Sequence, residues 1–272
     1  MTNVADPSPV EQDAVLVERR GHVLLVTLNR PHARNAVNNA LWLGVGEALD
    51  DAESDPDVWV VVITGAGDLS FCAGADLKEA ALGRLGQGDA RFAAWGFAGY
   101  VTHHISKPTI AAVNGFALGG GTEIVLASDL AVAVDTATFG LPEVKRGIVA
   151  GAGGTFRLPR QIPQKVAMEA ILTGTSITAQ RAHELGLINR VVPAAELFTE
   201  AFALAEAICA NAPLAVQTSK RIARGITDGR IESEDADWNR TAVESKALIA
   251  TDDAREGMRA FAEKRQPQWT SR

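Results

Sequence analysis

Two glutamates stand next to glycine-rich segments and have the chemistry for proton transfer. Glu123 follows the glycine triplet 119–121 and falls in the first turn of a helix predicted at 122–128. Glycine lets a ligand approach the backbone, and the free N–H groups at a helix start favour an anion or a developing oxyanion. Glu143 precedes a second glycine cluster at 151–154. Two carboxylates held by such loops predict an acid–base pair beside an oxyanion donor.

Each glutamate also has a simpler interpretation. The helix dipole alone favours a carboxylate in a first turn, and Glu143 could pair with Lys145 or Arg146, where an exposed ion pair contributes about 0–1 kcal/mol. A strand, a glycine turn and a helix also begin a nicotinamide-binding unit, although these glycines do not fit the G-x-G-x-x-G spacing. An acid–base enzyme and a nicotinamide-dependent oxidoreductase therefore both remain open at this point.

The flanking segments predict alternating strands and helices. The apolar run 109–113 is typical of a buried strand, 58–64 of a strand buried on both faces, and 15–19 with 23–29 predicts a hairpin. Apolar strands begin at five places, each followed by turns and helices: Val23, Val58, Thr109, Leu130 and Leu187. This order indicates an α/β fold built from a repeated β-β-α unit.

The composition changes at about residue 194, where strand formers become rare and Ala, Glu, Arg and Lys dominate. Helical spacing then predicts an all-helical tail with segments around 196–211, 213–226, 231–250 and 252–264. We therefore predict three regions, which are a flexible N-terminal tail at 1–13, a mixed α/β core at 14–195 and a C-terminal helical region at 196–272.

The composition narrows the class of protein. With 272 residues, 47% apolar and 22% charged, the chain is typical of an ordinary soluble protein with a substantial core. A net charge of −7 argues against a nucleic-acid partner, and no apolar run has the roughly 18 residues of a membrane span. The first 13 residues lack the pattern of a signal peptide, so we expect a cytoplasmic protein. Cys72 and Cys209 are too few for a disulfide framework, and no metal-ligand spacing surrounds them.

Two longer strings identify a family resemblance. The segment NGFALGGGTE at 114–123, with FCAGADLK at 71–78 upstream, closely resembles the crotonase superfamily of enoyl-CoA hydratases and isomerases, and within it the enoyl-CoA hydratases. The resemblance runs from about residue 15 to residue 269. It implies a crotonase-like spiral of β-β-α turns that stacks two sheets, with the acyl-CoA site in the core. It also implies a C-terminal helical region that packs on a neighbouring subunit, giving a homotrimer or a homohexamer.

The resemblance also assigns roles to individual residues. The N–H groups of Ala75 and Gly120 form an oxyanion hole for the thioester carbonyl, Glu123 activates water for addition at C3, and Glu143 supplies a proton at C2. Substrate and coenzyme A contacts are implied at Ala33, Ala73, Ala75, Asp76, Leu77, Lys78, Gly119, Gly120 and, from an adjacent subunit, Lys264. No metal and no cofactor is implied, because coenzyme A is part of the substrate.

The expected activity is that of an enoyl-CoA hydratase, a lyase of fatty-acid or related acyl-CoA metabolism such as β-oxidation. Both glutamates favour hydration or its reverse over enoyl-CoA isomerisation, which typically relies on one. Thr122 and Ala150 depart from the residues that are frequent in the family, cysteine and proline, and could mark a dedicated dehydratase of a polar acyl group, such as carnitinyl-CoA. A non-catalytic CoA-ester binder stays open. The aromatic segment 79–106 either packs in the core or lines the acyl pocket.

Overall fold

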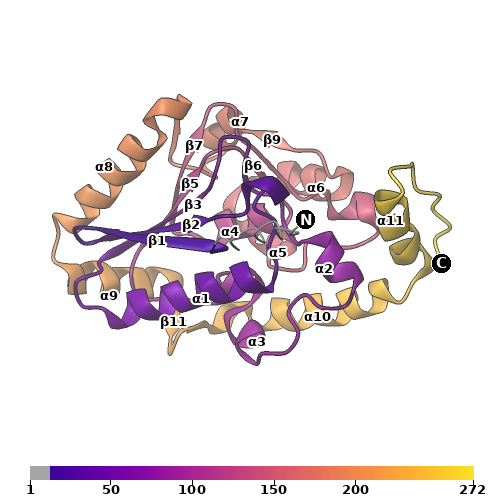
Figure 1. Ribbon diagram of the computed structural model, residues 1–272, viewed down its shortest axis with the longest axis horizontal. Helices are drawn as coiled ribbons and strands as arrows, with labels where there is room; N and C mark the ends of the chain where they lie inside the picture. The colour runs from indigo at the N-terminus through magenta and orange to yellow at the C-terminus, as the bar shows by residue number, and fades with distance from the viewer. Residues whose placement is uncertain (1–12) are drawn as a thin grey trace, which may run out of the picture.

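Two β-sheets run through the computed structural model, which describes residues 13–272 and so leaves all but one residue of the predicted tail outside the described part (Figure 1). The larger sheet has the order β1 (Val15–Arg20), β2 (Val23–Leu28), β3 (Val60–Gly65), β5 (Thr109–Val113), β7 (Leu130–Val134) and β10 (Arg190–Val192). The smaller sheet has the order β4 (Ser70–Cys72), β6 (Phe116–Leu118), β8 (Thr138–Gly140) and β9 (Ile177–Thr178).

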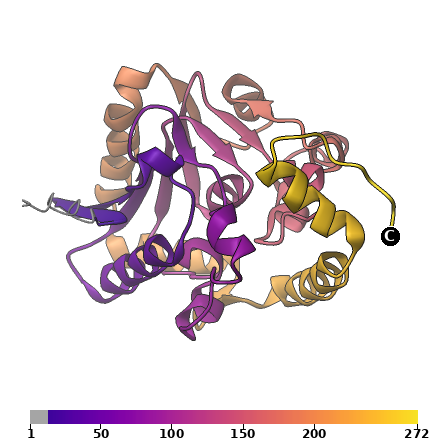
Figure 2. The same cartoon turned by 45° about the vertical axis from the view of Figure 1, so that its right-hand side comes forward.

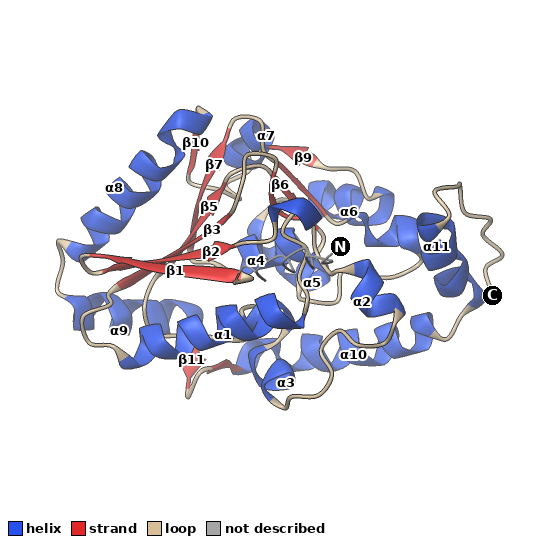
Figure 3. Ribbon diagram, in the orientation of Figure 1, coloured by secondary structure: helices blue, strands red, loops and turns tan. Residues whose placement is uncertain are grey.

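The two sheets are linked three times in the same way. β3 leads into β4, β5 into β6 and β7 into β8, so that each of these three strands of the larger sheet is followed by one of the smaller sheet and then by helical structure (Figure 3). Neighbouring strands from β2 to β10 pair in parallel. The predicted α/β spiral of β-β-α units is therefore confirmed.

Burial explains the composition of the strands. All residues of β3 and β5 are buried, as expected for parallel strands covered on both faces, and their sequences are nearly continuous apolar runs. β1 pairs antiparallel with β2 at the edge of the sheet, and most of its residues are exposed. The turn between them uses Gly21 at a φ of 61°. The predicted hairpin is confirmed.

The helices fall into a core set and a C-terminal set. The core helices are α1 (Asn39–Ser54), α2 (Leu77–Ala81), α3 (Arg91–Trp95), α4 (Gly120–Ala127), α5 (Gly154–Gln161), α6 (Gln164–Thr173) and α7 (Ala179–Glu184). The C-terminal helices are α8 (Leu197–Cys209), α9 (Pro213–Arg224), α10 (Asp235–Ile249) and α11 (Asp252–Ala262). Short 3₁₀ turns include η1 (Pro31–Ala33), η2 (Phe97–Gly99), η3 (Pro142–Arg146), η4 (Ala194–Glu196) and η5 (Glu232–Glu234). α8 packs across β3, β5 and β7, while α1 packs on β1 and β2.

The prediction of an all-helical tail is wrong at one place. A hairpin of β11 (Ile226–Thr227) and β12 (Arg230–Ile231) separates α9 from α10. Asp228 and Gly229 join the two strands with φ values of 48° and 72°, and an Asp-Gly pair favours such a tight turn. The helix expected from residue 231 consequently begins at Asp235.

The last two helices fold back onto the core of the same chain (Figure 2). α11 packs against η3, and a side chain at Gly147 would meet the backbone of Asp253 at 2.5 Å. Arg146 also places its guanidinium 4.4 Å from the centre of the Phe261 ring. Packing of the tail on a neighbouring subunit, and the domain boundary at 195, stay predictions.

Within residues 13–272, no single helix is long and apolar enough to span a membrane. One pair of helical segments, 194–209 and 213–224, reaches the required length and hydropathy when counted together, but the two segments are bent by 103° relative to each other.

Candidate active site

A cavity of about 780 Å³ lies where the glycine-rich turns meet the C-terminal helices. Seven of the predicted site residues line it: Ala73, Ala75, Leu77, Gly119, Gly120, Glu123 and Glu143. Aromatic side chains from distant segments complete the lining: Trp42, Phe92, Phe97, Trp238 and Phe261. Three segments that are far apart in the sequence therefore bring both glutamates and both predicted N–H donors to one space.

The two predicted oxyanion donors lie side by side. A Cβ placed on Gly74 would be 3.2 Å from the Gly120 nitrogen, so the 73–75 segment passes close to the start of α4. Gly119, at a φ of 57°, precedes the first residue of α4, and the helix therefore begins at Gly120 rather than at Thr122 as predicted. Among the described residues, neither the Ala75 nor the Gly120 N–H has a hydrogen-bond acceptor. Both donors remain available to an oxygen in the cavity.

Glu123 is held in the first turn of α4 with only 3% of its surface exposed. The Gly154 N–H, at the start of α5, donates to its Oε1 at 2.8 Å. Burial, and then the Glu143 carboxylate, raise the pKa of Glu123 to about 8, against the lowering effects of the Gly154 and Ala152 amides and Arg157. The carboxyl is thus fixed in direction but keeps a proton to unusually high pH.

Glu143 reaches the same cavity from η3. Its Oε1 would lie 2.9 Å from a Cβ on Gly119, so the glycine leaves the space that this carboxyl occupies. Burial raises the pKa of Glu143 to about 7. Its Oε2 is buried and has no hydrogen-bond partner among the described residues. Because the two glutamates repel each other, the pair retains one shared proton near neutral pH.

We predict that the Glu123→Gln variant gains stability over the wild type as the pH rises. The folded pKa of about 8 lies above the ordinary 4.5, so the folded chain binds more protons than the unfolded chain between these values. Stability from this group is present below pH 4.5 and is lost as pH rises toward 8. Urea unfolding measures the free energy of unfolding of the variant and of the wild type. We expect the difference between the two values to grow by on the order of 2 kcal/mol from pH 5 to pH 8. The exposed Glu169→Gln variant is the control, and a difference that does not change with pH would contradict the raised pKa.

Four predicted contacts lie outside the cavity lining, namely Ala33, Asp76, Lys78 and Lys264. The Asp76 carboxylate caps α2 by accepting from the Lys78 N–H, and it also binds the Arg30 guanidinium at 3.0 Å. Lys78 and Lys264 are exposed, and Lys264 follows α11 with a φ of 54°. Their coenzyme contacts stay predictions, while the side chain of Asp76 is already engaged in structural contacts.

The aromatic segment at 79–106 serves both of the purposes that the sequence left open. Phe92 and Phe97 line the cavity and meet Trp42 of α1 edge to face, at 5.2 and 5.3 Å between ring centres. Phe97 also fills the space beside Gly120, where a Cβ would lie 2.2 Å from its ring. Trp95 and Tyr100 are instead core residues, 7% and 4% exposed.

The Thr122 side chain stabilises the turn before α4. Its hydroxyl lies 2.6 Å from the Ala117 carbonyl and 2.9 Å from the Gly140 nitrogen, so it donates to one strand of the smaller sheet and accepts from the next. The Thr122 side chain is buried and is not part of the cavity lining. Ala150 is likewise buried, and a Cβ on Gly154 would meet its methyl group at 2.9 Å.

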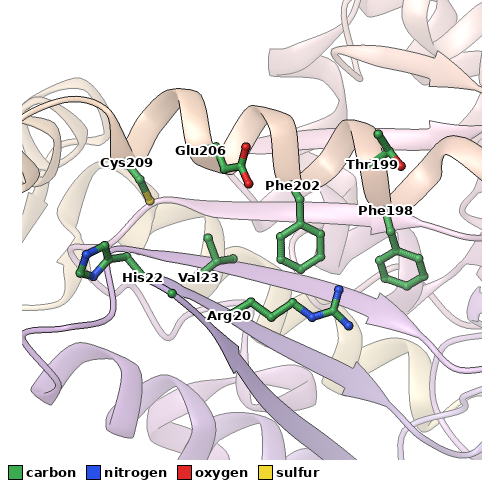
Figure 4. A pocket seen from close by; sticks show the side chains of 9 residues that line it. Arg20, His22, Val23, Phe198, Thr199, Phe202, Glu206 and Cys209 are labelled. Carbon is green, nitrogen blue, oxygen red and sulfur yellow. The ribbon is translucent and has the colours of Figure 1, made fainter.

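A second hollow of about 600 Å³ lies far from the glutamates, between the β1–β2 turn and α8 (Figure 4). Arg20 crosses the Phe202 ring at 4.9 Å there, and the other side chains include Phe198, Glu206 and Cys209. Its lining includes one carboxylate, that of Glu206. This hollow therefore does not bring two carboxylates together, as the cavity around Glu123 and Glu143 does.

Sequence reasoning missed the part of the cavity wall that comes from the C-terminal helices. Trp238 of α10 and Phe261 of α11 both line the cavity, together with Arg146 of η3. Trp238 interrupts an otherwise polar stretch of α10, and this is the one local signal that could have indicated a contact. Nothing in the sequence near residue 238 shows that it meets Gly153, where a Cβ would lie 3.2 Å from its ring.

Comparisons with known proteins agree over nearly the whole chain. A family profile described as enoyl-CoA hydratase/isomerase matches residues 18–272. The carnitinyl-CoA dehydratase of Proteus mirabilis is 44% identical over 93% of this chain and 97% of its own. The crystal structure of carnitinyl-CoA hydratase from Mycobacterium avium is 58% identical, with a TM-score of 0.93 over 96% of this chain and 100% of its own. That of enoyl-CoA hydratase from Mycobacterium tuberculosis H37Rv is 43% identical, with a TM-score of 0.73 over 96% and 100%.

Proposed function

The chain belongs to the enoyl-CoA hydratase/isomerase family, the crotonase family, and from that premise we propose that it is a hydro-lyase that interconverts a trans-2-enoyl-CoA and a 3-hydroxyacyl-CoA. One observation supports this proposal most strongly. The cavity holds two carboxylates with raised pKa values next to two N–H groups that have no acceptor within residues 13–272. Hydration needs both features, because it moves two protons and passes through an enolate.

In the proposed mechanism the thioester oxygen accepts hydrogen bonds from the N–H groups of Ala75 and Gly120. Glu123 removes a proton from water as the water oxygen bonds to C3, and the C2–C3 π electrons move toward the thioester to form an enolate. Each N–H donor of this kind stabilises the transition state by about 3–4 kcal/mol. Glu143 then gives its proton to C2 as the enolate collapses. A proton moves from Glu123 back to Glu143 to complete the cycle, and dehydration follows the same steps in reverse.

The shared proton of the glutamate pair suits this division of roles. Because the two carboxyls repel each other, one is protonated near neutral pH and the other is ionised. With the proton on Glu143, Glu123 is the base and Glu143 is the acid, as hydration requires. With the proton on Glu123, the roles fit dehydration. The steps balance with the substrate, water and these two side chains, so the proposal includes no metal or redox cofactor.

Loss of enoyl-thioester ultraviolet absorbance tests the proposed reaction. The purified protein should consume a trans-2-enoyl-CoA and form the 3-hydroxyacyl-CoA, identified by mass. Chain lengths from four to sixteen carbons would define the acyl preference. No loss at any length, with CoA-ester binding still measurable, would favour a different reaction of the family or a binding role. NADH added without an acyl-CoA should show no fluorescence change, which distinguishes this activity from an oxidoreductase.

For the acyl group we propose a polar, cationic substrate of the carnitinyl-CoA type. The relatives at 44% and 58% identity bear the names carnitinyl-CoA dehydratase and carnitinyl-CoA hydratase. A carnitinyl group carries a quaternary ammonium on C4, one carbon from the site of water addition. The cavity offers such a cation both carboxylates and aromatic rings, including those of Phe97 and Trp238, and aromatic faces attract quaternary ammonium groups.

We predict that the enzyme distinguishes this cation from a neutral group of the same shape. The two substrates are 4-trimethylammonio-but-2-enoyl-CoA and 5,5-dimethylhex-2-enoyl-CoA, in which a carbon replaces the nitrogen. We expect kcat/KM to favour the cation by about tenfold or more, the equivalent of roughly 1.4 kcal/mol from carboxylate and aromatic contacts. Equal values, or a preference for the neutral ester, would instead support an ordinary enoyl-CoA hydratase.

We also propose a homotrimer or homohexamer in the cytoplasm, consistent with the family. Large apolar side chains are exposed on the C-terminal helices: Leu214 and Ile222 on α9, and Val243 and Ile249 on α10. Exposed apolar groups gathered on helices favour subunit contacts. Sedimentation equilibrium should give three or six times the chain mass of 28.7 kDa, and a monomer at micromolar concentration would contradict this assembly.

A further inference from the structure

Two buried charged residues close to Glu123 have no role in the mechanism above. Arg157 is 2% exposed and Glu234 is 8% exposed. The Arg157 Nε donates to Glu234 Oε1 at 3.0 Å, and its Nη2 donates to Oε2 at 2.6 Å, so the two side chains meet as a bidentate pair. Burial of an ion pair costs desolvation that apolar residues would avoid, so stability alone is a weak reason for one here.

The arginine end of the pair lies behind the amide that holds Glu123. Arg157 sits in the first turn of α5, whose first N–H, from Gly154, donates to the Glu123 carboxylate. The Arg157 side chain folds back over Gly153, where an added Cβ would lie 3.3 Å from its Cδ and 3.4 Å from its Nη1. Gly153 has a φ of 105°, a conformation that glycine adopts readily. The guanidinium therefore covers the turn that presents the amide to Glu123.

The glutamate end of the pair lies at the start of α10, a helix that contributes to the cavity lining. Glu234 occupies the position just before α10, and Trp238 lies one turn further along that helix and lines the cavity. The Trp238 ring lies 5.3 Å from the Arg157 guanidinium and also touches Gly153. The ion pair thus joins the turn that holds Glu123 to the start of the helix that closes the cavity.

We propose that Arg157 and Glu234 are positioning residues, which fix the 153–154 turn against Glu123 and set the net charge that faces this carboxylate. The proposal deepens the proposed function, because it rests on Glu123 as the acid–base group. Its structural part, the control of the charge at Glu123, does not depend on which acyl-CoA is the substrate.

The charges around Glu123 come from three packed elements. Glu143 of η3 opposes its ionisation, while Arg157 of α5 favours it. Glu234 of η5 reduces the effect of Arg157, because it neutralises the guanidinium at hydrogen-bond distance. The neighbouring His104 has a pKa lowered to about 4, chiefly by burial, so it is neutral near pH 7.

Two further cations lie near the ion pair, but they have a partner of their own. The Lys220 ammonium binds the Asp129 carboxylate at 2.7 Å, and Arg224 lies 3.9 Å from the same carboxylate. On α10, Asp237 binds the exposed Arg160. Arg157 is therefore the cation that acts on Glu123 in this region, with Glu234 as its counterion.

The two partners should shift the titration of Glu123 in opposite directions. Glu234→Gln keeps the shape and one hydrogen bond but leaves the Arg157 charge uncompensated, which should lower the pH at which Glu123 ionises by roughly half to one unit. Arg157→Gln removes the favourable charge and should raise this pH by a similar amount. The double variant should return close to the wild type. If the ion pair only held α5 and α10 together, the two single variants would not shift the titration of Glu123 in opposite directions.

The experiment measures the infrared band of the protonated Glu123 carboxyl between pH 5 and pH 9, assigned by its loss in Glu123→Gln. The exposed Arg160→Gln variant is the matched control, because Arg160 and Asp237 join α5 and α10 without a contact to Glu123. Thermal melts check folding, and Arg157→Met, which also removes the charge, replaces Arg157→Gln should the latter not fold. The pH dependence of kcat is the second readout and should move in the same directions as the band.

Opposite shifts in the two single variants, with the Arg160→Gln titration unchanged, would support the proposal. Unchanged titrations, shifts in one common direction, or an equal shift in Arg160→Gln would overturn it. The infrared titration needs no turnover, so it decides the role of the pair separately from the proposed function. If no enoyl-CoA is hydrated by the wild type, the proposed function fails while the titration result still holds.

Discussion

Hydration by the Glu123→Gln variant is expected to fall by about 10²- to 10⁴-fold in kcat, with little change in affinity for the CoA ester. Glutamine has the same shape as glutamate and can still accept the Gly154 hydrogen bond, but it cannot remove a proton from water. The Glu143→Gln variant should lose a similar factor, because it cannot give a proton to C2. Stopped-flow absorbance on an enoyl-CoA measures kcat, and calorimetry with a saturated acyl-CoA measures affinity.

Two comparisons make this result specific to the pair. Glu169 is exposed on α6, so Glu169→Gln should keep full activity. The Glu123→Gln and Glu143→Gln double variant should lose little more than either single variant, because the two groups act in one cycle and their effects are not additive. Near-normal hydration by either single variant would remove that residue from the mechanism. A large loss of affinity in both would show that they bind the acyl group rather than transfer protons.

The sequence predicted those parts of the site that are local. Glu123 lies two residues after the last of its glycines, so one helix start sets both the carboxylate and the Gly120 donor. The buried strands β3 and β5 were predicted from apolar runs, because parallel strands covered on both faces need no polar alternation. The second donor, Ala75, required the family resemblance, since no local pattern shows that residues 73–75 pass beside Gly120.

The parts that were missed depend on contacts between distant segments. Arg157 and Glu234 are separated by 77 positions, and each alone has the sequence context of an ordinary surface residue. Trp238 reaches Gly153 only because α10 folds back across the core. The hairpin at 226–231 was missed for a different reason, since its strands are two residues each and the flanking helical composition outweighs the Asp-Gly turn signal.

The Gly121→Ala substitution tests whether the contact between α4 and β4 sets the oxyanion hole. Gly121 lies inside α4 with an ordinary φ, so helix propensity alone predicts that alanine stabilises the protein by about 1 kcal/mol. The contacts predict the opposite, because an added Cβ would lie 2.0 Å from the Cys72 carbonyl oxygen. The helix start would have to move away from β4, and we expect a loss of about 1–3 kcal/mol in unfolding free energy.

The same movement should reduce activity beyond what the lost stability explains. Cys72 leads directly into the segment that ends at Ala75, so displacement of α4 separates the Gly120 N–H from the Ala75 N–H. Misplacing one donor should lower kcat/KM by about 10²- to 10³-fold, while the fold remains intact at 25 °C.

Gly44→Ala in α1 is the control, because its Cβ would meet only the Val15 side chain, at 3.0 Å, on an edge strand that can shift. Urea unfolding and kcat/KM together decide the outcome. If Gly121→Ala is as stable and active as Gly44→Ala, the turn tolerates the added methyl group, and the donors are held by the Thr122 hydroxyl and the sheet rather than by close contact with β4.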